Sequence, residues 1–177
     1  VAKVLDRSGN LSDELIGEFT VQKNQVAVTV QLQGAAAGPF TREVVFTATA
    51  FDGSVLKTWT RAVEFTSAVG TTTLLEAPDG MARLSAKTAW TLRTRLVCAA
   101  DGNGQAIAHF TETRSLRGGD LDENNQVDMR DYSILRYDWY SVVPEQVFRS
   151  DITGNAAVDL LDFNVLKANW YTIGDAQ

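Results

Sequence analysis

The 177-residue sequence is poor in the residues that build disulfide frameworks and many metal centres, since it contains one cysteine and one histidine. The single Cys98 excludes a disulfide framework and a zinc cluster of several cysteines. His109 has no obvious partner for acid–base or nucleophilic catalysis. The chain begins at Val1 with neither a Met nor a signal-peptide pattern, which indicates a processed form or a piece of a longer protein. We therefore expect no enzyme activity in this chain, and place any catalytic domain upstream of it.

Two further features are missing, and each excludes a class of partner. No apolar run approaches the ~20 residues that a membrane-spanning helix needs, and no basic stripe suited to nucleic acid is visible. The acidic residues are instead segregated. From residue 118 onward the chain has eleven Asp or Glu against four Lys or Arg, whereas residues 1–117 have eleven against twelve. Because the negative charge gathers in the last third, the sequence predicts that this part binds cations.

Residues 1–115 are typical of a β-module. Short stretches rich in Val, Thr and Phe alternate with turn signals, and Asp52-Gly53 between two of them predicts a hairpin. The expected strands are residues 18–21, 25–32, 42–50, 55–65, 71–75, 88–97 and 106–112. About seven short strands predict a β-sandwich of immunoglobulin-like size, although the Cys–Trp–Cys spacing of antibody domains is absent.

The pattern changes after residue 115, and residues 116–119 are expected to be a linker to a second, small all-α module at 120–177. Within this module, residues 120–140 repeat as residues 151–171, with eight of twenty-one aligned positions identical. Such regularity indicates one supersecondary unit used twice. Each copy has aromatic and leucine side chains on one helical face. These are Tyr132, Leu135 and Trp139 in the first copy and Phe163, Leu166 and Trp170 in the second.

Each copy opens with an oxygen-rich loop whose spacing matches calcium chemistry. Calcium takes 6–8 oxygen ligands, and an EF-hand-type loop supplies them from positions 1, 3, 5, 7, 9 and 12. The candidate ligands of the first loop are Asp120, Asp122, Asn124, Gln126, Asp128 and Asp131. Those of the second loop are Asp151, Thr153, Asn155, Ala157, Asp159 and Asp162. We expect two calcium ions, with the first loop tighter because Thr153 replaces a carboxylate in the second.

The Asp at position 12 and the helix that only follows each loop resemble a type I dockerin rather than a calmodulin-type EF-hand. The resemblance covers about 60 residues and implies a pseudo-twofold pair of calcium loops. It also implies that the module binds a cohesin-type partner, in a secreted or surface protein of polysaccharide degradation or surface assembly. Position 6 of the loop, often Gly because the chain turns sharply there, is Asn125 and Ala156. Asn tolerates the left-handed conformation, and Ala adopts it at a cost of about 1 kcal/mol.

The resemblance also assigns partner-reading positions on the two repeats. In the first repeat these are Met129, Arg130, Arg136, Tyr137 and Ser141. In the second repeat they are Leu160, Leu161, Lys167, Ala168 and Thr172. Because the two sets differ chemically, we expect one preferred binding orientation, through the more apolar second set. The alternative is that Leu160 and Leu161 pack inward against the β-module.

Two other functions remain open at this point. The β-module could bind polysaccharide, with Trp59 or Trp90 as a stacking platform. It could also resemble the immunoglobulin-like X-modules that precede some dockerins. Finally, the calcium loops could serve only as a structural cap of the β-module, without an outside partner.

Overall fold

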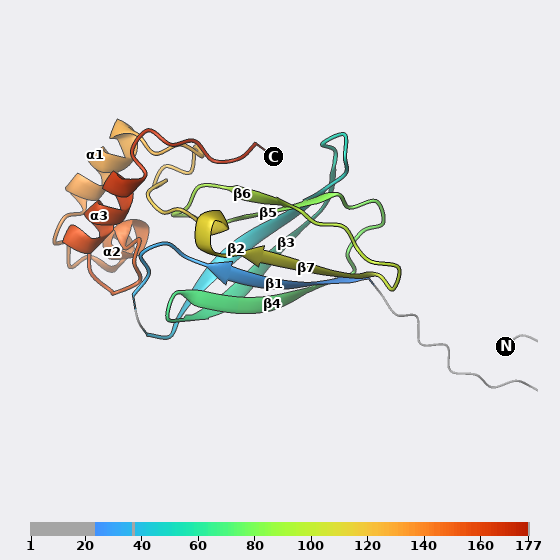
Figure 1. The fold of residues 1–177 in the computed structure, drawn as a ribbon. Coiled ribbons are helices and arrows are strands. Elements are labelled where there is room, and N and C mark those ends of the chain that lie inside the picture. Colours follow the sequence, from blue (N-terminus) through green and yellow to red (C-terminus); the bar gives the residue numbers. More distant parts are fainter. Residues whose placement is uncertain (1–23, 37, 177) are drawn as a thin grey trace, which may run out of the picture.

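The computed structural model describes residues 24–36 and 38–176, so the strand expected at 18–21 lies outside the described residues. Seven strands form one sheet in the order β6-β5-β2-β3-β4-β1-β7 (Figure 1). Their bounds are β1 Gln25–Gln31, β2 Phe40–Thr49, β3 Val55–Thr66, β4 Val69–Leu75, β5 Arg83–Lys87, β6 Thr94–Val97 and β7 Gln105–Phe110. All pairings are antiparallel except that of β1 with β7.

The predicted two-sheet sandwich is wrong, because the described strands belong to a single sheet that curls until its edge strands β6 and β7 contact each other. Side chains alternate between more and less buried along β1, β3, β4 and β7, whereas consecutive residues are buried at the end of β2 and in the middle of β5. The largest fully buried side chains are Phe46, Phe65 and Phe110. Period-two alternation fixes which side chains face the core. It does not fix whether the strands divide into two sheets or close into one.

The hairpin at Asp52-Gly53 is confirmed. Strands β2 and β3 are antiparallel neighbours, and Gly53 has a φ of +91° in the turn between them. The Asp52 carboxylate accepts hydrogen bonds from the Ser54 backbone N–H at 2.9 Å and from its hydroxyl at 2.7 Å. Asp supplies this local hydrogen bonding and Gly the left-handed backbone.

Only the end of the strand expected at 88–97 forms, as β6, and β5 was not expected from the sequence. β5 ends at Lys87, β6 begins only at Thr94, and the segment between them leaves the sheet. A turn closed by a hydrogen bond from the Thr88 N–H to the Thr91 hydroxyl at 2.9 Å redirects the chain. As a result the buried side chains of Trp90 and Leu92 pack outside the core of the sheet.

Three short helices gather at one end of the sheet (Figure 1). They are α1 Met129–Tyr137, α2 Pro144–Ser150 and α3 Leu160–Ala168, and a 3₁₀ turn, η1, covers Glu112–Arg114. Helices α1 and α3 were expected from the repeat, whereas α2 was not. In the described part of the chain, no helix is long and apolar enough to cross a membrane.

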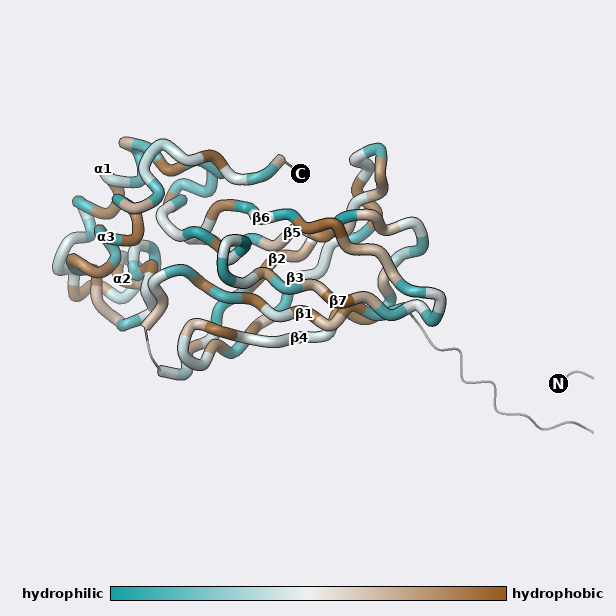
Figure 2. Tube along the Cα trace, in the orientation of Figure 1, coloured by the Kyte–Doolittle hydropathy of each residue, from teal (hydrophilic) through white to brown (hydrophobic). Residues whose placement is uncertain are grey.

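The helices do not form a separate all-α module, so the predicted two-module fold class is wrong. Trp90 and Leu92 from the sheet region share one hydrophobic cluster with the helical segments, and Figure 2 shows hydrophobic stretches on strands and helices alike. The other buried members of the cluster are Leu121, Val127, Leu135, Ile152, Val158, Val165 and Leu166. We call this cluster, together with its segments after residue 118, the helical layer. Long-range packing of this kind has no local sequence signal.

Residues 116–119, the expected linker, are hydrogen-bonded to the sheet region. The Leu116 N–H donates to the Gln31 carbonyl at 2.9 Å, and the Gly119 N–H donates to the Trp90 carbonyl at 2.8 Å. Leu116, Gly118 and Gly119 are buried. The chain therefore passes from the sheet into the first acidic loop through ordered, paired backbone.

Candidate metal centre

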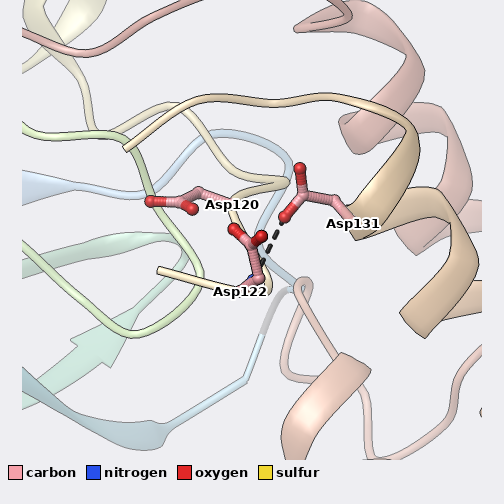
Figure 3. Close-up of side chains that lie close together, drawn as sticks. All are labelled: Asp120, Asp122 and Asp131. Carbon is pink, nitrogen blue, oxygen red and sulfur yellow. Dashed lines mark hydrogen bonds between the residues drawn. The ribbon is translucent and has the colours of Figure 1, made fainter. Parts of the chain in front are cut away.

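The first acidic loop brings three carboxylates together. Asp120, Asp122 and Asp131 each place a carboxylate oxygen within 4.8 Å of the others. Figure 3 shows these three side chains lying close together. Asp120 follows the buried Gly118-Gly119 pair, and Asp131 lies in the first turn of α1. Two ends of a twelve-residue loop thus meet around one point, which is the arrangement that a hard cation requires.

The two oxygens of Asp120 have different surroundings. Oδ2 accepts a hydrogen bond from the Asn125 N–H at 3.0 Å and an ion pair from Lys87. Oδ1 is buried, and the part of the chain that the structure describes offers it no hydrogen-bond partner. A buried acceptor without a partner is costly, and a bound cation would satisfy it. The residues present therefore fit a calcium ion on the Oδ1 side of Asp120.

Asp131 closes the loop and begins the helix at the same time. Its Oδ1 accepts from the N–H groups of Leu121 at 2.6 Å and Asp122 at 3.1 Å, and its Oδ2 accepts from the Asp128 N–H at 2.7 Å. Asp128 in turn caps α1 by accepting from the Arg130 N–H, which completes a capping box. Calcium loop and helix start are therefore one hydrogen-bonded unit.

Burial raises the pKa of two carboxyl groups in the first loop. It raises the pKa of Asp120, opposed by the hydrogen bond from Lys87, and it raises the pKa of Asp131, opposed by the three backbone N–H groups. The cause is desolvation of a negative charge near other carboxylates. A divalent cation would reverse the shift because it favours the charged form.

The remaining candidate ligands of the first loop are Asn124, Gln126 and Asp128, and none of them belongs to the group of three carboxylates. The Asn124 side chain donates to Asp122 at 3.0 Å and accepts from the Gln126 N–H at 2.7 Å. Gln126 forms an isolated bridge with Ile173. Asp128 is outside the group of three carboxylates and acts as the helix cap. The structure thus brings together three of the four predicted carboxylates of this loop.

The second loop repeats this backbone scaffold with fewer carboxylates. The Asp151 carboxylate accepts from the N–H groups of Gly154 at 2.7 Å and Ala156 at 2.9 Å. Asp162 accepts from the N–H groups of Thr153 and Asp159, each at 2.9 Å, and burial raises its pKa. Asn155 donates to Asp159, which caps α3, and Ala157 donates to Asn155. No group of three acids is found in this loop among the described residues.

The left-handed conformation predicted at position 6 is confirmed in both loops. Asn125 has a φ of 68° and Ala156 a φ of 64°. Asn125 is also held from outside its loop, since it accepts from the Arg93 N–H at 2.7 Å and donates to the Asp175 carbonyl at 3.1 Å. The Ala156 side chain cannot form such hydrogen bonds, and its Cβ is unfavourable at positive φ. The left-handed backbone at Ala156 is therefore strained without this compensation.

Replacing Ala156 by Gly is therefore expected to raise the free energy of unfolding by about 1 kcal/mol. Denaturant unfolding in the presence of calcium measures the change. The matched control is Ala157→Gly one residue later, which is not among the positive-φ residues and should lose stability. Equal effects of the two substitutions would contradict the account of strain at position 6.

The two repeats interlock reciprocally. The Tyr140 N–H donates to the Val158 carbonyl at 3.1 Å, and the Tyr171 N–H donates to the Val127 carbonyl at 2.9 Å. Val127 and Val158, at position 8 of the two loops, thus each pair with the end of the other repeat. The predicted aromatic faces do meet, with Tyr132 ring centroids 6.0 Å from Phe163 and 5.9 Å from Trp170.

Two cationic side chains of the sheet contact the acidic loops and were not predicted from the sequence. Lys87 pairs with Asp120, and Arg42 of β2 donates to the Asp151 carbonyl at 2.5 Å. The Arg42 guanidinium lies 3.7 Å from the centroid of the Trp90 ring, and burial lowers its pKa. Both contacts join residues more than thirty positions apart, so no local motif could have indicated them.

Neither tryptophan proposed as a sugar platform presents an open face. Trp59 is 4% and Trp90 5% exposed. The Trp59 indole N–H donates to the Leu75 carbonyl at 3.0 Å, and that of Trp90 donates to the carbonyls of Phe148 and Arg149. A stacking platform requires an exposed ring, so these two residues do not serve as one.

The partner-reading positions lie on the outside of the helical layer. Leu160 is 58% and Leu161 54% exposed, so the alternative that they pack inward against the sheet is wrong. Six of the other assigned positions are exposed as well, and Ser141 and Thr172 are half-buried. The exposed six are Met129, Arg130, Arg136, Tyr137, Lys167 and Ala168. Sequence reasoning overlooked Val142 and Phe148, which are exposed apolar side chains in and before α2.

Comparison with known proteins shows a fold but no family. The chain matches no family model, and no curated protein matches it. It is similar to a chain in the crystal structure of an N-terminal interface mutant of a type II cohesin–X-dockerin complex from Acetivibrio cellulolyticus. The identity is 8%, the TM-score 0.57, and the match covers 85% of this chain and 97% of that chain. At this identity the likeness shows the fold alone.

The assignment of the last third to a type I dockerin is therefore wrong. The similar structure belongs to a type II complex, and the described chain is mostly β, with three short helices that share a core with the sheet. The assignment was based on the spacing of the candidate ligands. Such spacing alone does not define a protein family. The calcium ligands themselves rest on the geometry of the loops and stay a prediction.

Proposed function

We propose that this chain is a protein-docking module of a secreted or surface protein, stabilised by calcium in its two acidic loops. It contacts a partner protein module through the exposed ends of α1 and α3. The chain has a binding rather than a catalytic role. Extracellular calcium modules work at Kd values of roughly 10⁻⁴–10⁻³ M, which suits a site outside the cell.

One observation carries the proposal: exposed apolar side chains directly follow the capping residues of the loops. Met129 follows Asp128, and Leu160 and Leu161 follow Asp159. Exposed large apolar groups that are held rigidly beside a binding loop are typical of interaction surfaces. Because each cap is part of a loop, the ion would order the residues that contact the partner.

The similar structure suggests the class of partner. It contains a cohesin and an X-dockerin in one complex, so its fold belongs to a protein–protein assembly. We therefore propose a protein module as the partner, with the cohesin-type partner expected from the sequence as one arm of the test.

The test immobilises this chain and measures binding of the separated cohesin and X-dockerin chains of that complex, in calcium and in EDTA. Calcium-dependent binding of either chain supports the proposal. Binding of neither chain, or binding that persists unchanged in EDTA, contradicts it. A second candidate function, a structural cap of the sheet, is favoured by the shared cluster around Trp90. It predicts calcium-dependent stability without binding in either arm.

A further inference from the structure

Lys87 connects the sheet to the first acidic loop. It is the last residue of β5, and its side chain is largely buried. The ammonium donates to the Thr91 carbonyl at 2.7 Å and to Oδ2 of Asp120. Because its ammonium is held by these two acceptors, the Lys87 side chain has little freedom to turn into solvent.

Lys87 uses one oxygen of the Asp120 carboxylate and leaves the other for the proposed ion. Oδ2 of Asp120 holds Lys87 together with the Asn125 N–H, whereas Oδ1 is buried without a partner in the described structure. Lys87 therefore adds a positive charge beside the loop, and Oδ1 stays open for a ligand.

Among the described residues, no lysine pairs with a carboxylate of the second loop. In the described structure, the Asp151 and Asp162 carboxylates accept hydrogen bonds from groups of their own loop, and Arg42 donates to the carbonyl of Asp151 rather than to its carboxylate. The two repeats thus differ in charge as well as in ligands. The first loop has more carboxylates, and Lys87 pairs directly with one of them. The second loop has fewer carboxylates, and Arg42 contacts only a backbone carbonyl of that loop.

We infer that Lys87 is the resident counter-charge of the first calcium loop and sets its affinity for the ion. When no ion is bound, the ammonium offsets the buried charge of Asp120, which would otherwise be uncompensated. When calcium binds, the same ammonium repels it across the carboxylate and lowers the affinity. The inference rests on the proposed calcium site and deepens it, because it names the residue of the sheet that tunes that site.

The test substitutes Lys87→Met and measures calcium binding by titration calorimetry, with thermal melting in calcium and in EDTA. One of the two dissociation constants is expected to fall about tenfold, and the other to stay unchanged. The melting temperature in EDTA should fall more than that in calcium, so the calcium-induced gap widens. The matched control is Lys57→Met, which removes an equal charge from β3, where Lys57 pairs with Glu76.

The outcomes separate the inference from the function on which it rests. If the unaltered chain binds no calcium, the proposed calcium site fails. If that chain binds calcium and Lys87→Met binds it equally well or more weakly, the counter-charge fails while the calcium site stands. Should Lys87→Met not fold, Lys87→Gln keeps a donor for Thr91 and Asp120 without the charge, and the same tenfold change is expected.

Discussion

Removing calcium with EDTA is expected to lower the free energy of unfolding of the helical layer by about 2.7 kcal/mol for each site held at a hundredfold excess over its Kd. The reason is that Asp120, Asp122 and Asp131 are held within 4.8 Å of one another, and without the ion their repulsion is offset only at Asp120, by Lys87. Hydrogen exchange resolved by segment measures this loss directly. Protection should fall in residues 118–176.

The sheet provides the internal control for this experiment. Its core around Phe46, Phe65 and Phe110 is a separate cluster from that of the helical layer. Exchange in β2 and β3 should therefore change little, while Trp90 and Leu92, which belong to the helical layer, should respond with it. Melting curves with and without EDTA that superimpose would contradict the role of calcium.

Substituting both Leu160 and Leu161 by Asp is expected to weaken partner binding at least a hundredfold and to leave the melting temperature unchanged. Both side chains are more than half exposed, so Asp replaces apolar surface that only a partner would bury. A few apolar anchors commonly carry most of the binding energy of an interface, at 2 kcal/mol or more each. Surface binding assays with the partner chain and thermal melts measure the two effects.

The first repeat supplies the matched control. Met129 and Arg130 occupy the equivalent positions on α1 and are also exposed. Because the two faces differ, one partner surface cannot fit both equally well, and we expect Met129→Asp with Arg130→Asp to change binding only a few-fold. A large drop in melting temperature for the leucine pair, or equal losses for both pairs, would contradict the preferred orientation.

The parts of this structure that could be predicted from sequence are those determined by local spacing. Alternation placed most strands, and the 31-residue repeat placed both loops, both helices that follow them and the left-handed Asn125 and Ala156. Each of these features depends on residues within a dozen positions of one another. A hydrogen bond or a turn over such a distance has a sequence pattern of its own.

The parts that sequence reasoning missed depend on contacts between distant segments. Closure of the sheet requires β1 to pair with β7, and the joining of sheet and helices requires Trp90 to leave its strand. Lys87 and Arg42 look like ordinary strand residues until the fold places them beside Asp120 and Asp151. The spacing of the candidate calcium ligands also favoured a type I dockerin, which the whole fold does not support.

Titration calorimetry on the unaltered chain, after removal of bound ions, tests whether the two acidic loops bind calcium. The account predicts two calcium ions per chain, with the loop of Asp120, Asp122, Asp128 and Asp131 tighter than that of Asp151, Asp159 and Asp162. Single substitutions Asp122→Ala and Thr153→Ala assign the two binding events to their loops. A titration without calcium-dependent heat, at concentrations up to several millimolar, would contradict the account.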